Sequence, residues 1–117
     1  MSENLVLDKS KRFAVRIVRL YQYLNREKKE YILSKQLLRC GTSIGANIVE
    51  ANDAISKNDF INKMYIALKE CSETLYWIEL LYNTKYLTST QYKSILLDCN
   101  ELRRLLTAIL KTAKHDG

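Results

Sequence analysis

The segment 33-LSKQLLRCGTSIGANIVEA-51 contains the pattern on which the fold prediction depends. Apolar residues recur along it every three or four positions, the spacing that places side chains on one face of an α-helix. The row consists of Leu33, Leu37, Cys40, Ile44, Ile48, Ala51 and, just beyond the segment, Ile55. We therefore predict a helix over residues 31–54 that buries one side against the rest of the protein.

Three further segments repeat this periodicity and predict helices over residues 6–24, 57–82 and 89–113. Their rows are Phe13, Ile17, Leu20, Tyr21 and Leu24; Phe60, Met64, Leu68, Cys71, Leu75, Ile78 and Tyr82; and Tyr92, Ile95, Cys99, Leu102, Leu106, Ile109 and Ala113. Ser56 with Asp59, and Thr88 with Gln91, have the spacing of capping boxes at two helix starts. Residues 25–30 carry mixed charges and predict a solvated connection, and residues 114–117 are expected to fray.

The composition favours long helices joined into one domain. The 117 residues include no proline and only three glycines, the two residue types that interrupt or weaken helices. Four amphipathic helices with short connections predict an all-α protein, a single antiparallel up-down four-helix bundle over residues 1–117. A longer coiled-coil hairpin is the alternative, but it would need stricter heptads than these broad rows provide.

The second predicted helix also carries a polar stripe and two glycines. Gln36, Ser43, Asn47 and Glu50 recur at steps of seven, four and three residues, beside the apolar row. Gly41 and Gly45 each cost the helix about 1 kcal/mol relative to alanine, which close approach of another backbone can offset. The pair therefore predicts a tight helix crossing or a contact between protomers.

Polar groups at such a crossing need hydrogen-bond partners from another helix. We expect Glu73 and Ser72, with Arg39 or Arg103, to lie near Glu50. The interpretation is a structural polar network or an oligomer contact, with a ligand pocket or active site as the alternative. The residues assigned to this network are Gln36, Arg39, Ser43, Asn47, Glu50 and Glu73.

Large apolar residues outside the main rows suggest self-association. They are Ile61, Tyr65, Tyr76, Trp77 and Leu80 in the third helix, and Leu96, Leu97, Leu105 and Leu110 in the fourth. A bundle needs one inward face per helix, so surplus side chains must widen that core or cover another surface. We predict a homo-oligomer, and the alternative is packing at the helix edges.

The run from Gln36 to Glu50, followed by Phe60, Ala67-Leu68, Ser72-Glu73 and a leucine-rich last helix, resembles the 23S rRNA intervening-sequence protein family. The resemblance covers about residues 7–114. Its most specific part is Gln36, Arg39, Ser43-Ile44, Asn47-Ile48 and Glu50. Gly45 and Ala51 depart from the family, which often has proline and glycine at these places, so the shape and exit of this helix are in question.

The resemblance implies an up-down four-helix bundle that assembles into a ring, commonly a pentamer. Related proteins include the accessory variability determinant of diversity-generating retroelements, a basic pentamer that engages nucleic acid and a reverse transcriptase. The intervening-sequence members are encoded in inserts within rRNA genes. The resemblance implies no enzymatic activity.

Positive charge is concentrated at the start of the chain. Residues 1–30 hold eight Lys or Arg against four Asp or Glu, a net of +4, out of +6 for the whole chain. The steps between Lys9, Arg12, Arg16, Arg19 and Arg26 place these cations on one ridge. Arg104 and Lys111, with Lys114, add cations late in the fourth helix, which we expect beside the first. This surface predicts salt-sensitive binding to RNA or DNA, unless the cations only solvate an exposed face.

Catalysis has little support in the sequence. His115 is the only histidine and lies in the predicted tail, and there is no Gly-rich phosphate loop. Cys40, Cys71 and Cys99 fall within the apolar rows and are interpreted as small buried hydrophobes. We expect a cytoplasmic protein with no metal, cofactor, small-molecule substrate or membrane contact. The predicted function is non-catalytic binding of structured nucleic acid by an oligomer, and the alternative is a homo-oligomeric protein-interaction scaffold.

Overall fold

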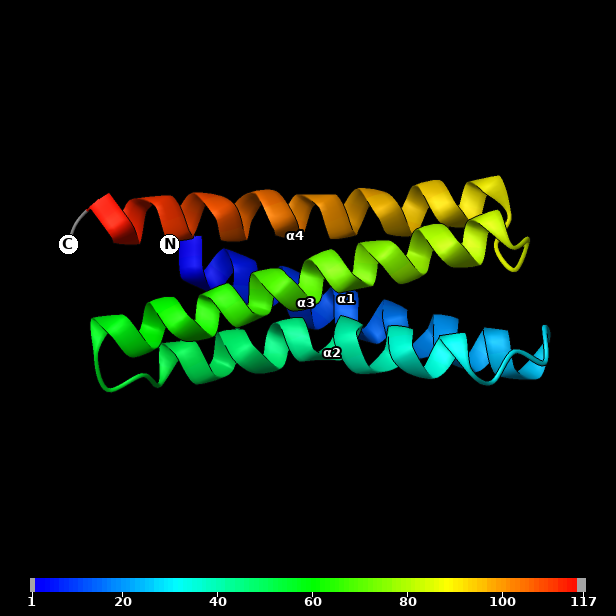
Figure 1. The fold of residues 1–117 in the computed structure, drawn as a ribbon, viewed down its shortest axis with the longest axis horizontal. Helices are drawn as coiled ribbons and strands as arrows, with labels where there is room; N and C mark the ends of the chain where they lie inside the picture. The colour runs from blue at the N-terminus through cyan, green and yellow to red at the C-terminus, as the bar shows by residue number, and fades with distance from the viewer. Residues whose placement is uncertain (1, 116–117) are drawn as a thin grey trace.

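Four long helices run alternately up and down (Figure 1). The structure is a computed structural model that describes the backbone of residues 2–115 and the side chains of residues 5–115. The helices are α1 Ser2–Arg26, α2 Leu33–Asn52, α3 Lys57–Asn83 and α4 Ser89–His115. Each helix packs against the next, and α4 also packs against α1. The chain is therefore the predicted antiparallel up-down four-helix bundle, 47 Å along its longest axis.

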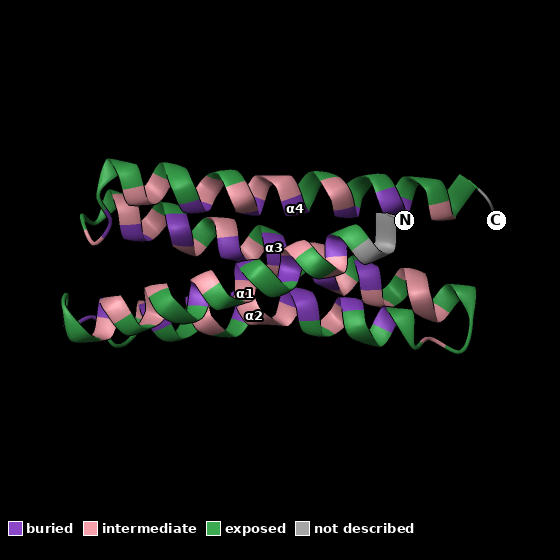
Figure 2. Cartoon of the chain, turned by 180° about the vertical axis from the view of Figure 1, so that it is seen from behind, coloured by how far each residue is buried: buried purple, intermediate pink, exposed green. Residues whose placement is uncertain are grey.

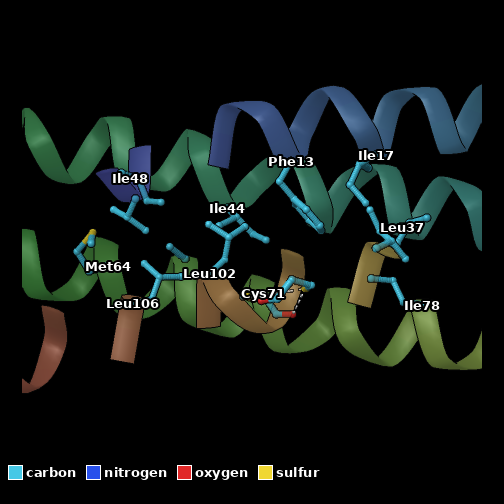
Figure 3. Close-up of a cluster of buried hydrophobic side chains, with 14 of the residues drawn as sticks. Phe13, Ile17, Leu37, Ile44, Ile48, Met64, Cys71, Ile78, Leu102 and Leu106 are labelled. Atoms are coloured by element: carbon cyan, nitrogen blue, oxygen red, sulfur yellow. Dashed lines mark hydrogen bonds between the residues drawn. The ribbon is translucent and has the colours of Figure 1, made fainter. Parts of the chain in front are cut away.

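The core lies along the axis of the bundle and receives side chains from all four helices (Figures 2 and 3). The labelled core residues are Phe13, Ile17, Leu37, Ile44, Ile48, Met64, Cys71, Ile78, Leu102 and Leu106, all nearly or completely buried. Burial of a side chain of this size stabilises a fold by about 1.5–3 kcal/mol. The predicted rows thus supply the core. Among residues 2–115, no helix is both long and apolar enough to cross a membrane.

The surplus apolar residues of α3 and α4 are mostly used within the bundle. Leu110 is buried, and Ile61, Trp77, Leu80, Leu96 and Leu105 are partly buried. Only Tyr65, Tyr76 and Leu97 of that set are exposed. The edge-packing alternative therefore describes most of these residues, and self-association needs support from another surface.

The predicted capping box at Thr88 is complete, and the one predicted at Ser56 supplies its N-cap bond. The Ser56 hydroxyl accepts a hydrogen bond from the Asp59 N–H at 3.0 Å, so α3 begins where expected. Thr88 and Gln91 bond each other reciprocally, side chain to backbone, at 2.9 and 3.1 Å. Ile55 was wrongly placed in the α2 row: it is 96% exposed because α2 ends at Asn52.

The predicted fraying is wrong for Lys114 and His115, which belong to α4, and residues 116–117 lie outside the described chain. The helix α1 is also longer than expected at both ends. Apolar periodicity locates the buried turns of a helix and carries no information about exposed terminal turns, which explains both differences.

The connection between α1 and α2 is not fully solvated, because Glu30 is buried there with only 8% exposure. Its carboxylate accepts hydrogen bonds from the N–H groups of Ile32, Leu33 and Ser34, at 2.7–3.1 Å. The Ser34 hydroxyl in turn donates to the Glu30 carbonyl oxygen at 2.9 Å. Three N–H groups that no helical carbonyl can reach are thereby satisfied. Burial opposes ionisation of this carboxyl, but the backbone donors prevail and lower the pKa of Glu30.

The two glycines of α2 lie where it crosses α1. A Cβ added to Gly41 would come within 2.8 Å of Ile17 Cγ1, and one added to Gly45 would lie 3.1 Å from Ser10 Oγ. Both neighbours are completely buried. The glycines therefore permit a close approach of α1 and α2 within one chain, which is the tight crossing that the small-residue pair predicted.

The three cysteines are free and buried, as expected for small hydrophobes. Burial raises the pKa of the Cys40 thiol to about 11, so it stays protonated at neutral pH. Cys71 and Cys99 face each other between α3 and α4, with their sulfur atoms 3.8 Å apart. Their thiols fill space that larger side chains could not occupy at this contact.

The α1–α2 crossing predicts unequal effects of two glycine substitutions. Gly41→Ala gains about 1 kcal/mol of helix propensity but overpacks Ile17, which costs about 1–3 kcal/mol. We expect a net loss of about 1 kcal/mol in the free energy of unfolding, measured by urea titration. Gly45→Ala is the matched control and should be nearly neutral, because its methyl group meets a small side chain at 3.1 Å. A Gly41→Ala protein more stable than the parent would contradict the crossing.

The Glu30 cap predicts a pH-dependent contribution to stability. A folded-state pKa below the unfolded value means that ionised Glu30 stabilises the protein above about pH 4.3. This contribution is lost as pH falls through the folded pKa. Glu30→Gln should cost about 1–2 kcal/mol at pH 7, because one amide oxygen replaces a charged acceptor of three bonds.

The difference between parent and Glu30→Gln should then shrink at pH 3, as measured by urea unfolding at both pH values. Glu27→Gln, at an exposed position of the same connection, should change little at either pH. An equal cost of Glu30→Gln at pH 7 and pH 3 would show that the carboxylate charge contributes nothing.

Candidate nucleic-acid interface

Two cations of the predicted α1 ridge are bound to carboxylates of α4. Lys9 Nζ lies 3.2 Å from Glu101 Oε1, and Arg16 Nη1 lies 2.6 Å from Asp98 Oδ2. Arg16 also donates to the Ser94 carbonyl at 3.2 Å and to the Ser94 hydroxyl at 2.7 Å. Partly exposed pairs of this kind add little stability. They do place a carboxylate beside each cation, so Lys9 and Arg16 serve the α1–α4 contact.

The other ridge cations, Arg12, Arg19 and Arg26, are exposed and form no ion pair with a described residue. Arg12 borders a small groove of about 110 Å³ that Asp98 and Glu101 also line. The ridge is therefore interrupted by negative charge from α4. Spacing within α1 could not reveal this, because both acids lie more than eighty residues further along the chain.

Arg104 and Lys111 lie on a different surface from the α1 ridge. They line a groove of about 590 Å³ together with Arg103, Thr107 and Ala108 of α4 and with Leu68 and Ser72 of α3. The fourth helix does lie beside the first, as expected, but the side of α4 that faces α1 carries Asp98 and Glu101 and not these two cations. We call this surface the α3–α4 groove.

The α3–α4 groove is positively charged without compensation. None of its described lining residues is acidic. Arg103, Arg104 and Lys111 are exposed and form no ion pair with another described residue. Arg103 was not among the predicted site residues. The adjacent pair Arg103-Arg104 could have indicated a cationic surface on the fourth helix. The sequence alone did not say which side of α4 would remain exposed.

The polar stripe of α2 forms a surface network with α3. Arg39 pairs with Glu73, lies 3.5 Å from Glu70, and its Nε and Nη2 approach the Gln36 side-chain oxygen at 3.4 Å. The Trp77 indole N–H donates to Glu73 at 3.0 Å. Every carboxylate of this cluster thus has a cationic or N–H partner. The arrangement supports the structural interpretation of the stripe.

Glu50 is paired differently from the expectation. Its carboxylate lies 3.0 Å from Lys63 Nζ, and neither Glu73 nor Ser72 is its partner. The antiparallel turn explains this, since the end of α2 lies beside the start of α3 while Arg39 lies beside Glu70 and Glu73. Ser43 and Asn47 make no bond to another helix among the described residues: they donate to the carbonyls of Arg39 and Ser43, at 2.6 and 2.9 Å.

The comparisons with known proteins agree with the resemblance read from α2. The profile of the 23S rRNA-intervening sequence protein family matches residues 2–108. A crystal structure of a protein of unknown function from the S23 ribosomal protein family of Bacteroides thetaiotaomicron is 58% identical, with a TM-score of 0.94. The match covers 95% of this chain and 99% of that one. No curated protein matches. With four helices in the expected order and a profile match over most of its length, this chain belongs to the 23S rRNA-intervening sequence protein family.

Proposed function

We propose that this protein is a non-catalytic, homo-oligomeric helical bundle that binds structured nucleic acid, RNA or DNA, through the α3–α4 groove. The observation that carries the proposal is the groove itself, where three cations line one surface that no described acidic residue shares. Uncompensated arginine and lysine side chains attract phosphate, and each arginine can hold two phosphate oxygens at once. The net charge of +6 adds long-range attraction.

Helix geometry supports a ligand with a row of phosphates, such as a nucleic-acid backbone, over a single small anion. Arg104 and Lys111 are two turns apart on α4, or about 10 Å along the helix axis. That distance spans about three phosphates at the 3.4 Å spacing of one strand. The cations are thus distributed along a line, as a polyanion requires, and Arg12 and Arg19 on α1 could extend the contact only around the edge of the bundle.

Self-association is the second part of the proposal, and the outer face of α1 supports it. Val15 is 52% exposed and Val18 is 38% exposed, one turn apart. With Ala14, Arg19 and Gln22 they line a largely apolar groove of about 450 Å³. Neighbouring apolar side chains that the bundle leaves open are typical of protein contacts. Repetition of the α3–α4 groove around an oligomer would strengthen binding to a long polyanion.

The nucleic-acid proposal predicts a charge-specific loss of binding. Reversing Arg103, Arg104 and Lys111 to glutamate should weaken binding of a fluorescein-labelled RNA or DNA stem-loop at least 10-fold, measured by anisotropy in 50 mM salt. The parent should show a slope of about −3 in a plot of log affinity against log salt, one unit per phosphate contact. Circular dichroism should be unchanged, because the three side chains are exposed.

A matched control separates the groove from net charge. Reversing Lys28, Lys35 and Lys57 removes the same charge from exposed positions elsewhere and should weaken binding far less. Reversing Arg12 and Arg19 tests the α1 ridge in the same assay. If the parent binds neither stem-loop at low salt, the proposal fails. A protein partner recovered from cells would then favour the scaffold function.

The self-association proposal predicts a molar mass several times the 13.7 kDa of one chain, measured by light scattering at micromolar concentration. Val15→Glu with Val18→Glu should reduce it to that of a monomer, because burial of two carboxylates in an apolar contact is unfavourable. Leu97→Glu, at an exposed position of α4, is the control and should leave the mass unchanged. A monomeric parent would exclude the oligomer.

A further inference from the structure

We infer that the α3–α4 groove binds an unpaired nucleic-acid strand, whose phosphates contact the cations of α4 while its bases stack on Tyr65 and Tyr76 of α3. This inference rests on the proposed function and names the part of a structured nucleic acid that the groove takes, namely an unpaired segment such as the loop of a stem-loop. It follows from the exposed residues of α3 that share a helical face with Ser72, which lines the groove.

Those residues form one stripe along α3. Tyr65, Lys69, Ser72 and Tyr76 are separated by four, three and four residues, which places them on the same helical face. All four are exposed, with Tyr65 at 44% and Tyr76 at 59%. Ser72 lines the groove, so the stripe runs along the groove edge with one tyrosine on either side of Ser72. The stripe contains a further cation and no acid.

The two tyrosines differ from the other aromatic residues of α3 and α4. Tyr82 and Tyr92 stack on each other with ring centroids 4.1 Å apart, and Trp77 is held by Glu73. Core packing therefore does not account for Tyr65 and Tyr76. Exposed aromatic rings beside a row of cations are the combination that single-strand binding proteins use, since every base has a face that can stack.

The ammonium group of Lys114 lies over the ring of Tyr65, at the position that a stacked base would take. It lies 4.8 Å from the ring centroid, a cation–π contact made from α4 across to α3. Stacking of a base on an aromatic ring stabilises more than a cation–π contact at an exposed site. A base arriving at Tyr65 would therefore displace the ammonium, which would then be free to approach a phosphate.

The spacing of the tyrosines sets the length of strand. The two tyrosines are eleven positions apart in the helix, or about 16 Å, which a strand of a few unstacked nucleotides can span. A duplex fits less well, because its bases stack on one another and offer no free face. Arg104 and Lys111 also lie in one row along α4, which suits one phosphodiester backbone.

The test uses fluorescein-labelled eight-nucleotide oligoadenylates, as RNA and as DNA, and a hairpin duplex with few unpaired bases. We expect the single strand to bind more tightly than the duplex. Tyr65→Ala and Tyr76→Ala should each weaken single-strand binding about 10-fold without changing the salt slope, because they remove stacking and no charge. Tyr65→Phe keeps the ring and should bind as the parent does. Tyr31→Ala, exposed at the α1–α2 connection, should have no effect.

Trp77 supplies an independent readout. It is the only tryptophan and packs edge-on against Tyr76, with ring centroids 5.0 Å apart. Stacking of a base on Tyr76 should therefore quench or shift Trp77 fluorescence, and Tyr76→Ala should abolish that response. Charge reversal of Arg104 should weaken binding and also reduce the salt slope by about one unit.

The outcomes separate this inference from the proposed function. If charge reversal abolishes binding but Tyr65→Ala and Tyr76→Ala bind as the parent does, or the duplex binds as tightly as the single strand, the groove binds nucleic acid without stacking and this inference is wrong. If neither nucleic acid binds, the proposed function fails as well. Binding of a polyglutamate peptide in preference to oligonucleotide at equal salt would assign the groove to an acidic protein. Comparison of the affinities for the RNA and the DNA oligoadenylates shows which of the two nucleic acids the groove prefers.

Discussion

The close approach of α1 and α2 at Gly41 and Gly45 is the constraint on which the rest of the structure depends. Ile17 fills the space that a side chain at Gly41 would occupy, so the two helices meet at short distance. This contact sets the position of α2, against which α3 then packs through Ile44, Ile48 and their neighbours. The loss of helix propensity at two glycines is offset by apolar burial along the whole crossing.

Antiparallel packing then decides which charges remain available. Because α4 runs alongside α1, Asp98 and Glu101 meet Arg16 and Lys9 and neutralise two of the five cations of the α1 ridge. The same rotation of α4 turns Arg103, Arg104 and Lys111 toward α3, where no described acid opposes them. A protein with an excess of cations near its N-terminus thus presents its open cationic groove near its C-terminus. If the function depends on phosphate binding, it is determined by which cations remain unpaired and not by the net charge.

The polar residues at the start of α2 and between α2 and α3 have a different role in the molecule. Arg39, Glu73 and Trp77 join α2 to α3 on the surface, and Glu30 closes the start of α2 from a neighbouring turn. These groups are hydrogen-bonded to one another or to the backbone, and they hold the helices in register. The proposed binding surfaces lie elsewhere, on the outer face of α1 and in the α3–α4 groove, so stability and binding can vary independently.

The sequence by itself determined four helices, their order and the residues that form the core, because a 3.6-residue period and short connections leave few other ways to bury the apolar rows. It also identified Ser56 and Thr88 as caps, since those bonds span only three residues. It could not place Glu30, Glu50 or the cations of α4. Glu30 bonds N–H groups in a turn of irregular backbone, which no helical pattern predicts. Glu50 meets Lys63 on another helix, and the cations of α4 remain unpaired among the described residues, because of how each helix is rotated about its axis. Local bonds are encoded locally, whereas the charge of a surface is decided by which helix faces meet.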